Sequence, residues 1–160
     1  MRANMQYSIK FKYNCSANYR MIKVLKIKNK LEKDQAFKIR NDVFVIEQQV
    51  DPSEEYDPED EMSTHFIAYY NDIPCGTCRW RFKEIGVIKL ERFAVLKEFR
   101  GYGIGQALAE ACINDLPYNT KTMLHAQTHA VDFYKKIDFE TYGEEFEEAG
   151  INHFAMKLIK

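Results

Sequence analysis

Residues 93–105 of the chain are Phe93-Ala94-Val95-Leu96-Lys97-Glu98-Phe99-Arg100-Gly101-Tyr102-Gly103-Ile104-Gly105. The apolar first part of this stretch predicts the end of a β-strand, and its three glycines precede a segment, 104–116, whose apolar spacing predicts a helix. Glycines let backbone N–H groups approach a ligand closely, and a helix N-terminus adds partial positive charge. Arg100 adds a full charge and a planar set of donors. The stretch is therefore suited to binding a pyrophosphate.

Two common phosphate-binding motifs do not match this stretch. A P-loop needs Gly-Lys-Ser/Thr after its glycines, and neither Gly103 nor Gly105 is followed by lysine. A dinucleotide-binding fold places Gly-x-Gly-x-x-Gly directly after its strand, whereas here a loop and Arg100 come first. The alternative is a glycine-rich turn that binds nothing, because glycine motifs alone are weak evidence.

The segments around this stretch predict a mixed sheet with helices on its faces. Strands are predicted first in a meander and then in alternation with helices, which is typical of an α/β or α+β layered fold. The predicted strands are 22–27, 66–70, 75–82, 87–95, 122–126 and 152–158. The predicted helices are 32–47, 104–116 and 129–137.

Length and composition exclude several classes of protein. The chain has 160 residues, of which 46% are hydrophobic and 29% charged, so it suits one globular domain with a sizeable core. A net charge of −1 makes nucleic acid an unexpected partner. No apolar stretch is long enough to span a membrane. Four cysteines are too few for a disulfide scaffold. We therefore expect a cytoplasmic protein that does not bind membranes.

The first twenty residues differ from the rest of the chain. Residues 7–13 alternate apolar and polar side chains as a strand does, but 14–20 show no pattern. Met21 precedes the first clearly patterned segment. We therefore predict an N-terminal extension over residues 1–20, ordered only if it finds a sheet edge or a partner, and a domain over 21–160.

Two runs of acidic residues stand out. Residues 51–61 contain seven acidic residues and no basic one, and residues 140–148 contain five glutamates. Such runs are usually solvated loops. The functional alternative is a negatively charged funnel that attracts an amine substrate.

Cys75-Gly76-Thr77-Cys78 resembles a metal or redox motif only superficially. The segment reads as a strand, so the two thiols are predicted to face opposite sides of a sheet. No second Cys-x-x-Cys is present to complete a zinc site. His125 and His129 are separated by a strand-to-helix break and are not expected to share a face. We predict no metal site.

Arg100-Gly101-Tyr102-Gly103-Ile104-Gly105 resembles the Arg/Gln-x-x-Gly-x-Gly/Ala signature of the GNAT superfamily of N-acetyltransferases. Ala130, Phe133, Tyr134 and Phe139 fall where that family has a second motif. Residues 40–48 and 150–153 resemble the small bacterial ElaA/YjcF-like branch. The resemblance covers about residues 22–158 and implies a GNAT-like acyl-CoA N-acyltransferase fold, with a central twisted, mostly antiparallel sheet and helices on both faces.

The resemblance also implies acetyl-CoA as cosubstrate, with its pyrophosphate on the glycine turn and its pantetheine arm along the preceding strand. Gln127 departs from the family's usual asparagine, and Asp138 replaces a glycine; aspartate enters the left-handed region at modest cost. The cofactor-binding residues implied are Phe93, Ala94, Val95, Arg100, Gly101, Gly103, Ile104, Gly105, Gln106, Gln127, Ala130, Phe133 and Tyr134.

The same resemblance points to Tyr134 as the group that protonates the departing thiolate, since a phenol near the sulfur can donate a proton. The alternative for Tyr134 is a packed core tyrosine. Glu47 and His153 are the principal candidates for the base that removes the proton of the ammonium group. His65 and Glu91 are further candidates.

Together these features predict an N-acetyltransferase that transfers an acetyl group from acetyl-CoA to a primary amine by direct attack in a ternary complex. The acceptor is a small-molecule amine or an amino-terminal or lysine amine, and a homodimer is expected by analogy with the family. The alternative function is a CoA-binding or CoA-sensing module without efficient catalysis.

Overall fold

The computed structural model describes residues 21–159 in full and residues 7–10 as backbone. The strands in this part are β1 (Tyr7–Lys10), β2 (Met21–Lys26), β3 (Thr64–Tyr70), β4 (Ile73–Glu84), β5 (Val87–Val95), β6 (Lys121–Gln127), β7 (Phe139–Glu148) and β8 (Ile151–Leu158). The α-helices are α1 (Lys30–Arg40), α2 (Pro52–Glu55), α3 (Ile104–Asp115) and α4 (Val131–Lys135). Other helical turns are η1 (Asn41–Glu47), η2 (Pro58–Glu61), η3 (Lys97–Phe99) and η4 (Thr128–Ala130).

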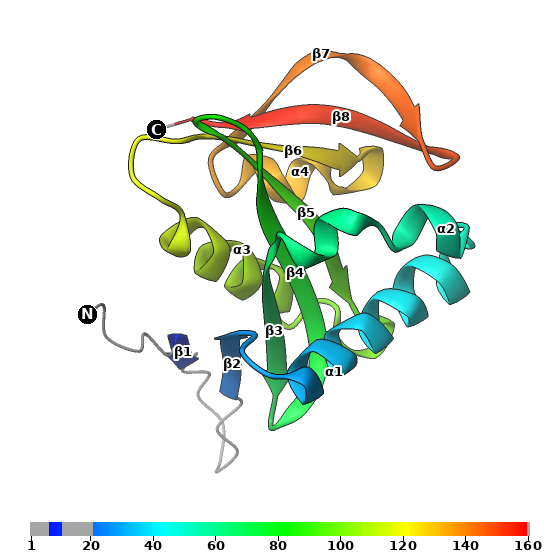
Figure 1. Cartoon of the computed structure of the whole chain (residues 1–160), viewed down its shortest axis with the longest axis vertical. Coiled ribbons are helices and arrows are strands. Elements are labelled where there is room, and N and C mark those ends of the chain that lie inside the picture. Colours follow the sequence, from blue (N-terminus) through cyan, green and yellow to red (C-terminus); the bar gives the residue numbers. More distant parts are fainter. Residues whose placement is uncertain (1–6, 11–20, 160) are drawn as a thin grey trace.

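The strands form one sheet in the order β1-β2-β3-β4-β5-β6-β8-β7 (Figure 1). Every neighbouring pair is antiparallel except β5 and β6, which run parallel. Parallel neighbours need a crossover connection, which α3 supplies here. The predicted mixed and mostly antiparallel sheet is confirmed.

Helices cover both faces of this sheet (Figure 1). On one face, Ile104 and Leu108 of α3 join the larger cluster of buried apolar residues, to which α4 also contributes. On the other face, Ala36 and Ile39 of α1 join a smaller cluster. Among the described residues, no helix is long and apolar enough to cross a lipid bilayer.

The first long helix changes its winding partway. The sequence predicts one helix over 32–47, and the structure has α1 over 30–40 followed by the π-helical turn η1 over 41–47. A π-helical turn widens the helix and is frequent at functional sites. Val43 still faces the sheet, whereas Glu47 and Gln48 at the end of η1 reach the cleft described below.

Strands β5 and β6 diverge along their length. Their pairing joins Val87–Leu90 to Lys121–Leu124, and it extends no further among the described residues. Beyond Leu90, Arg92 has a φ of 57°, and the register of β5 with β4 shifts at this point. Such a bulge bends a strand. β5 therefore turns away from β6 and leaves a wedge-shaped opening between them.

The second acidic run forms a strand that the sequence did not predict. Residues 139–148 make up β7, which pairs with β8 at the outer edge of the sheet. Most of its side chains are exposed. An edge strand exposed in this way needs no alternation of apolar and polar residues. The glutamate-rich sequence of β7 therefore lacks the pattern from which a strand is predicted.

The prediction that Cys75 and Cys78 face opposite sides of the sheet is wrong, because both belong to the larger buried cluster. The register between β3 and β4 shifts at Ala68/Tyr69, which places an extra residue in β4. Burial raises the pKa of the Cys75 thiol to about 12. Cys78 Sγ lies 3.3 Å from Cys112 Sγ. No group of three or more His, Cys, Asp or Glu side chains is arranged for a metal ion within the described residues.

The strand expected near the N-terminus is present over residues 7–10. β1 pairs antiparallel with β2, with Tyr7 opposite Val24 and Lys10 opposite Met21. β1 thus continues the sheet beyond β2. Phe11 and Tyr13, which the sequence places in the same strand, lie outside the described residues.

Candidate active site

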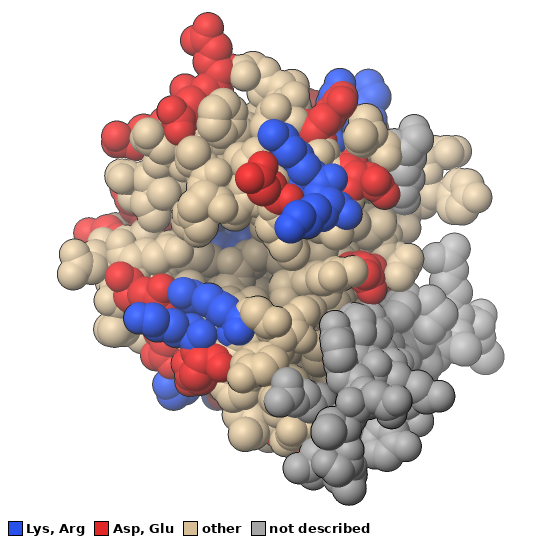
Figure 2. Space-filling view, turned by 180° about the vertical axis from the view of Figure 1, so that it is seen from behind, with Lys and Arg blue, Asp and Glu red and all other residues tan. Residues whose placement is uncertain are grey.

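A cleft of about 830 Å³ opens where β5 and β6 diverge. Its walls come mainly from β5, β6, η1 and the turn between β7 and β8. Seen from behind, the molecular surface is hollowed near its centre, with a basic residue in the floor of the hollow and groups of charged residues above and below it (Figure 2). The predicted site residues on the wall of the cleft are Glu47, Phe93, Ala94, Val95, Arg100, Gln127, Ala130, Tyr134 and His153.

The other predicted cofactor residues are not part of this wall. The Ile104 side chain is buried in the core, so only its backbone could contact a ligand. Gln106 donates to Glu110 on the exposed side of α3. Phe133 packs beneath Gly105, where an added Cβ would lie 3.4 Å from its ring. Gly101 and Gly103 form the turn that continues from Arg100 to α3.

This glycine turn leaves backbone donors available. Gly101 and Gly103 have φ values of 81° and 84°, a left-handed conformation that other residues adopt at a cost. Gly103 is the N-cap of α3, and no side chain caps the first turn of the helix. The N–H groups at the start of α3 are therefore available to a ligand or to water. Such a helix start favours an anion.

Arg100 and Glu47 are in direct contact across the mouth of the cleft. The guanidinium donates from Nη1 and Nη2 to the two carboxylate oxygens, both at 2.7 Å, and Nε donates to the Val95 carbonyl at 3.0 Å. The hydrogen bond from Arg100 lowers the pKa of Glu47. Arg100, a predicted cofactor ligand, is thus paired with Glu47, a predicted base. This pairing makes Glu47 a weaker base.

Tyr134 is held in an aromatic group on the α4 side of the cleft. Its ring packs edge-on against Phe93, Phe133 and Phe139, with centroids 4.9–6.0 Å apart. Only 7% of the residue is exposed, and burial raises the pKa of its hydroxyl far above the usual range. Among the described residues, none accepts or donates a hydrogen bond to this hydroxyl. The hydroxyl therefore keeps its proton and has no hydrogen-bond partner among these residues.

His153 lies on β8, where it pairs with Gln127 of β6. Its Nδ1 is 2.7 Å from the carbonyl oxygen of Ile151. A carbonyl oxygen only accepts, so Nδ1 carries a proton, and Nε2 of the neutral ring has a free lone pair. The ring stacks on Phe146 with a centroid distance of 5.9 Å. This arrangement fixes the tautomer that a general base requires.

The two other base candidates are less suitable. His65 is not on the cleft wall; its Nε2 lies 2.9 Å from the carbonyl oxygen of Asp60, and burial lowers its pKa. Burial alone would raise the pKa of Glu91, but the cations Lys89, Arg79 and Arg81 lower it to about 2. A carboxylate of such low pKa is a poor proton acceptor.

A buried charge cluster lies beneath the first acidic run. Arg40 of α1 donates to Glu55 and, at 2.6 Å, to Asp60. Arg79 of β4 also donates to Asp60 at 2.6 Å and to Glu91 at 2.7 Å. Each arginine is only 1% exposed. We refer to these residues, together with Asp57 and Arg92, as the buried charge cluster.

The first acidic run is therefore only partly a solvated loop, since some of its carboxylates pair with buried arginines while Glu54 is exposed at the cleft wall. Asp57 accepts from Arg79 at 2.8 Å and from Arg92 at 2.8 Å. Burial alone would raise the pKa of Asp57, but these two arginines lower it to about 2. With Glu55 and Asp60, three of the seven acidic residues hold α2 and η2 against the sheet.

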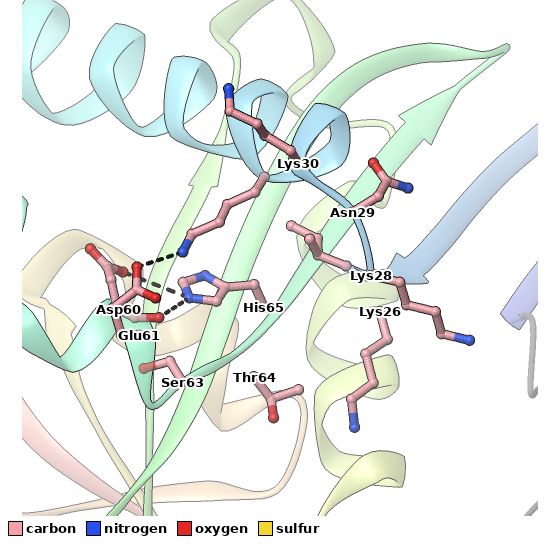
Figure 3. A pocket seen from close by; sticks show the side chains of 11 residues that line it. Lys26, Lys28, Asn29, Lys30, Asp60, Glu61, Ser63, Thr64 and His65 are labelled. Atoms are coloured by element: carbon pink, nitrogen blue, oxygen red, sulfur yellow. Dashed lines mark hydrogen bonds and ion pairs between the residues drawn. The ribbon is translucent and has the colours of Figure 1, made fainter.

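A second, more open cavity of about 390 Å³ lies near the start of α1, and Figure 3 shows the side chains that line it. Lys33 is bonded to Glu61 at 2.8 Å, and His65 is bonded to the backbone of Asp60. Lys26 is ion-paired outside the cavity. The polar groups here bond mostly to one another, so the larger cleft is the candidate active site.

Sequence reasoning missed two pairs of residues in the cleft. His125 Nδ1 lies 2.9 Å from a Glu148 carboxylate oxygen, and this bond lowers the pKa of Glu148 to about 2. Gln48 and Gln127 bond to each other across the cleft. Residues 123, 125 and 127 share one side of β6. His125 was therefore predictable as a neighbour of Gln127, whereas its partner on β7 was not.

The comparisons with known proteins agree with one another. The chain matches the family model of an acetyltransferase (GNAT) domain over residues 29–160. It is 39% identical over 138 residues to the uncharacterized N-acetyltransferase YjcF of Bacillus subtilis (strain 168), which covers 84% of this chain and 98% of YjcF. The structure is similar to Escherichia coli ElaA, with a TM-score of 0.74 and 25% identity over 87% of this chain and 100% of ElaA. A GNAT family acetyltransferase from Elizabethkingia anophelis with acetyl-CoA bound gives a TM-score of 0.60 and 19% identity over 85% of this chain and 94% of that protein.

Proposed function

Because the chain belongs to the GNAT family of acetyltransferases, we propose that it transfers the acetyl group of acetyl-CoA to a primary amine by direct attack in a ternary complex. The observation that carries this proposal is the cleft between β5 and β6, whose wall includes Arg100 at its mouth and both Tyr134 and His153 inside. A small-molecule amine or an amino-terminal or lysine amine is the acceptor.

In this proposal the glycine turn holds the pyrophosphate. Arg100 and the backbone amides of 101–105 supply charge-assisted hydrogen bonds. Arg100 leaves Glu47 to do so. The pantetheine arm lies along Phe93–Val95 as an added strand. One observation supports this arrangement: β5 lacks a strand partner beyond Leu90 on its β6 side among the described residues. The binding of acetyl-CoA itself agrees with the E. anophelis protein of the same fold, which has acetyl-CoA bound.

His153 and Tyr134 carry the two proton transfers. Nε2 of His153 accepts the proton that the ammonium group loses, which leaves a neutral amine to form the bond to the acyl carbon as the carbon–sulfur bond breaks. The Tyr134 hydroxyl gives its proton to the departing thiolate, and the second proton that the nitrogen loses as the amide forms restores that hydroxyl. The free Nε2 of His153 and the protonated hydroxyl of Tyr134 support these roles.

The experiment that tests the proposal compares two tyrosines. A panel of amines first identifies an acceptor. Tyr134→Phe removes the hydroxyl and keeps the packed ring, so kcat should fall by about 10²- to 10⁴-fold while acetyl-CoA affinity changes little. Tyr118→Phe is the matched control, because Tyr118 is 95% exposed and lies outside the cleft. Steady-state kinetics and calorimetry measure both properties.

Three results would contradict the proposal or part of it. Full activity in Tyr134→Phe removes the tyrosine from the mechanism. Tight binding of acetyl-CoA without turnover on any amine favours the alternative, a CoA-binding or CoA-sensing module. Failure of the wild-type protein to bind CoA excludes both functions.

A further inference from the structure

Two glutamine side chains join the opposite walls of the cleft. Gln127 Nε2 donates to Gln48 Oε1 at 2.9 Å, and Gln48 Nε2 lies 3.3 Å from Gln127 Oε1. Seventy-nine positions separate the two residues in the sequence. Because each amide both donates to and accepts from the other, the pair fixes the orientation of both side chains. We call this pair the glutamine bridge.

The glutamine bridge lies at a defined level of the wedge. Leu90 and Leu124 are the last paired residues of the parallel strands β5 and β6. Phe93 packs against Tyr134 on the face of the sheet that α3 and α4 cover, whereas Gln127, which alternates with the core residue Ala126, lies on the η1 face. Gln48 reaches this level from the end of η1. The bridge therefore closes the η1 side of the cleft, opposite Phe93 and Tyr134.

The surroundings of the bridge limit the space available. Val43, Phe44 and Val50 line the cleft on the same side as Gln48 and present apolar surface. Phe93 and Tyr134 pack together on the other side. Both bridging amides are partly buried, so a group that separates them must replace two hydrogen bonds that water reaches incompletely. An acyl chain longer than acetyl meets this barrier.

We propose that the glutamine bridge restricts the acyl group to the size of acetyl. This inference rests on the proposed function, because it requires the thioester end of an acyl-CoA to lie beside Phe93 and Tyr134. Gln48 and Gln127 act as specificity-determining residues: they close the end of the acyl space. Each amide keeps one N–H and further lone pairs for contact with the pantetheine arm.

Binding measurements on the full chain test this role without an acceptor amine. Calorimetry determines the Kd of CoA, acetyl-CoA, propionyl-CoA and butyryl-CoA. For the wild-type protein, we expect butyryl-CoA to bind at least about tenfold more weakly than acetyl-CoA, the scale of overpacking a closed site. Gln48→Ala and Gln127→Ala each break the bridge from one wall. In either variant the affinities for acetyl-CoA and butyryl-CoA should differ by no more than about threefold.

Gln49→Ala is the matched control. Gln49 neighbours Gln48, is exposed and lies outside the cleft wall, so this variant should discriminate as the wild-type protein does. Equal affinity of the wild-type protein for acetyl-CoA and butyryl-CoA overturns the proposal. Unchanged discrimination in the two bridge variants also overturns it, provided that their affinity for free CoA shows that the cleft is intact.

The two proposals fail in distinguishable ways. Loss of all CoA binding by the wild-type protein contradicts the proposed function. Binding of acetyl-CoA and butyryl-CoA with equal affinity contradicts only the role of the bridge.

Discussion

The two acidic runs are similar in composition and differ in what their carboxylates contact. In residues 51–61, Glu55 and Asp60 are almost fully buried against Arg40 and Arg79. In residues 140–148, most glutamates extend from the edge strand β7 into solvent. One member of the second run, Glu148, reaches the cleft and binds His125.

This difference originates in the arginines rather than in the acidic residues. Arg40 lies on the inner side of α1, and Arg79 lies on a central strand, so both require carboxylate partners within the core. A buried arginine without a partner is very unfavourable. The first run therefore acts as a structural counterion. Among the described residues, the ion-pair partners of the second run are His125 and Lys157 rather than a buried arginine, so this run is free to contribute to the site.

The largest expected effect comes from breaking the buried charge cluster. Asp60 accepts from both buried arginines, so Asp60→Asn leaves two charges incompletely paired. We expect the free energy of unfolding to fall by about 3–5 kcal/mol. Glu147→Gln in the second run should change it by less than about 0.5 kcal/mol. Urea unfolding of both variants measures the difference.

Asp57→Asn serves as a milder second variant if Asp60→Asn does not fold. Asp57 is partly exposed and contacts Arg79 and Arg92 but not Arg40. Equal stability of all three variants would show that the cluster is no more important than the exposed run.

The second prediction concerns the stability of the fold at low pH. The pKa values of Asp57 and Glu91 lie at about 2 in the folded chain, against about 4 when unfolded. Carboxyls with lowered pKa stabilise the fold above the unfolded value and lose this contribution as the pH falls toward the folded value. Burial raises the pKa of Glu55, which acts in the opposite sense and offsets part of the loss. We expect stability to fall by on the order of 2–3 kcal/mol between about pH 4.5 and pH 2.

Denaturant unfolding at several pH values measures this loss. Asp57→Asn should reduce the dependence on pH in this range, and Glu147→Gln should leave it unchanged. A stability that stays constant from pH 5 to pH 2 would show that these carboxyls have ordinary pKa values.

The parts of the molecule that sequence predicted well depend on local rules. The glycine turn before α3 follows from the residues that tolerate a left-handed backbone, and the central strands follow from apolar spacing. The predicted site residues on β5 and β6 share one cleft because these strands are parallel, so that their C-terminal ends lie at the same edge of the sheet. These features require no knowledge of distant partners.

The parts that were missed depend on pairing between distant segments. Glu47 and Arg100 are 53 positions apart, and each was assigned a separate role before the structure brought them together. His125 and Glu148 meet only because β7 pairs with β8 beside β6. The register shift at Ala68/Tyr69 that turns Cys75 inward has no signal in the sequence.

The third prediction tests whether the second run contributes to activity. Glu148 binds His125, and the charge of His153 also lowers the pKa of Glu148. Its carboxylate therefore positions the side chains around the proposed base, His153. Glu148→Gln should lower kcat by about tenfold, with a shifted pH profile, and change the free energy of unfolding by less than about 1 kcal/mol. Glu147→Gln is again the control. An unchanged rate and pH profile in Glu148→Gln would leave the second run without a role.

The smallest effect is expected when Glu47 is replaced. Glu47 combines features of the two runs, because it binds an arginine as the first run does but lies at the surface. Its ion pair with Arg100 is about 40% exposed, so the pair stabilises the fold by at most about 1 kcal/mol. A pyrophosphate on the glycine turn must compete with Glu47 for Arg100. Glu47→Gln removes the competitor, and CoA affinity measured by calorimetry should rise by about two- to fivefold.

The same variant separates the two roles considered for Glu47. If Glu47 only competes for Arg100, kcat in Glu47→Gln stays close to that of the wild-type protein while the affinity rises. If Glu47 is the general base, kcat falls by about 10²-fold or more. Because Arg100 lowers the pKa of Glu47 in the free protein and leaves it when the pyrophosphate binds, CoA itself would raise the basicity of this carboxylate. A rise in affinity with unchanged kcat therefore assigns the proton transfer to His153 and the competition to Glu47.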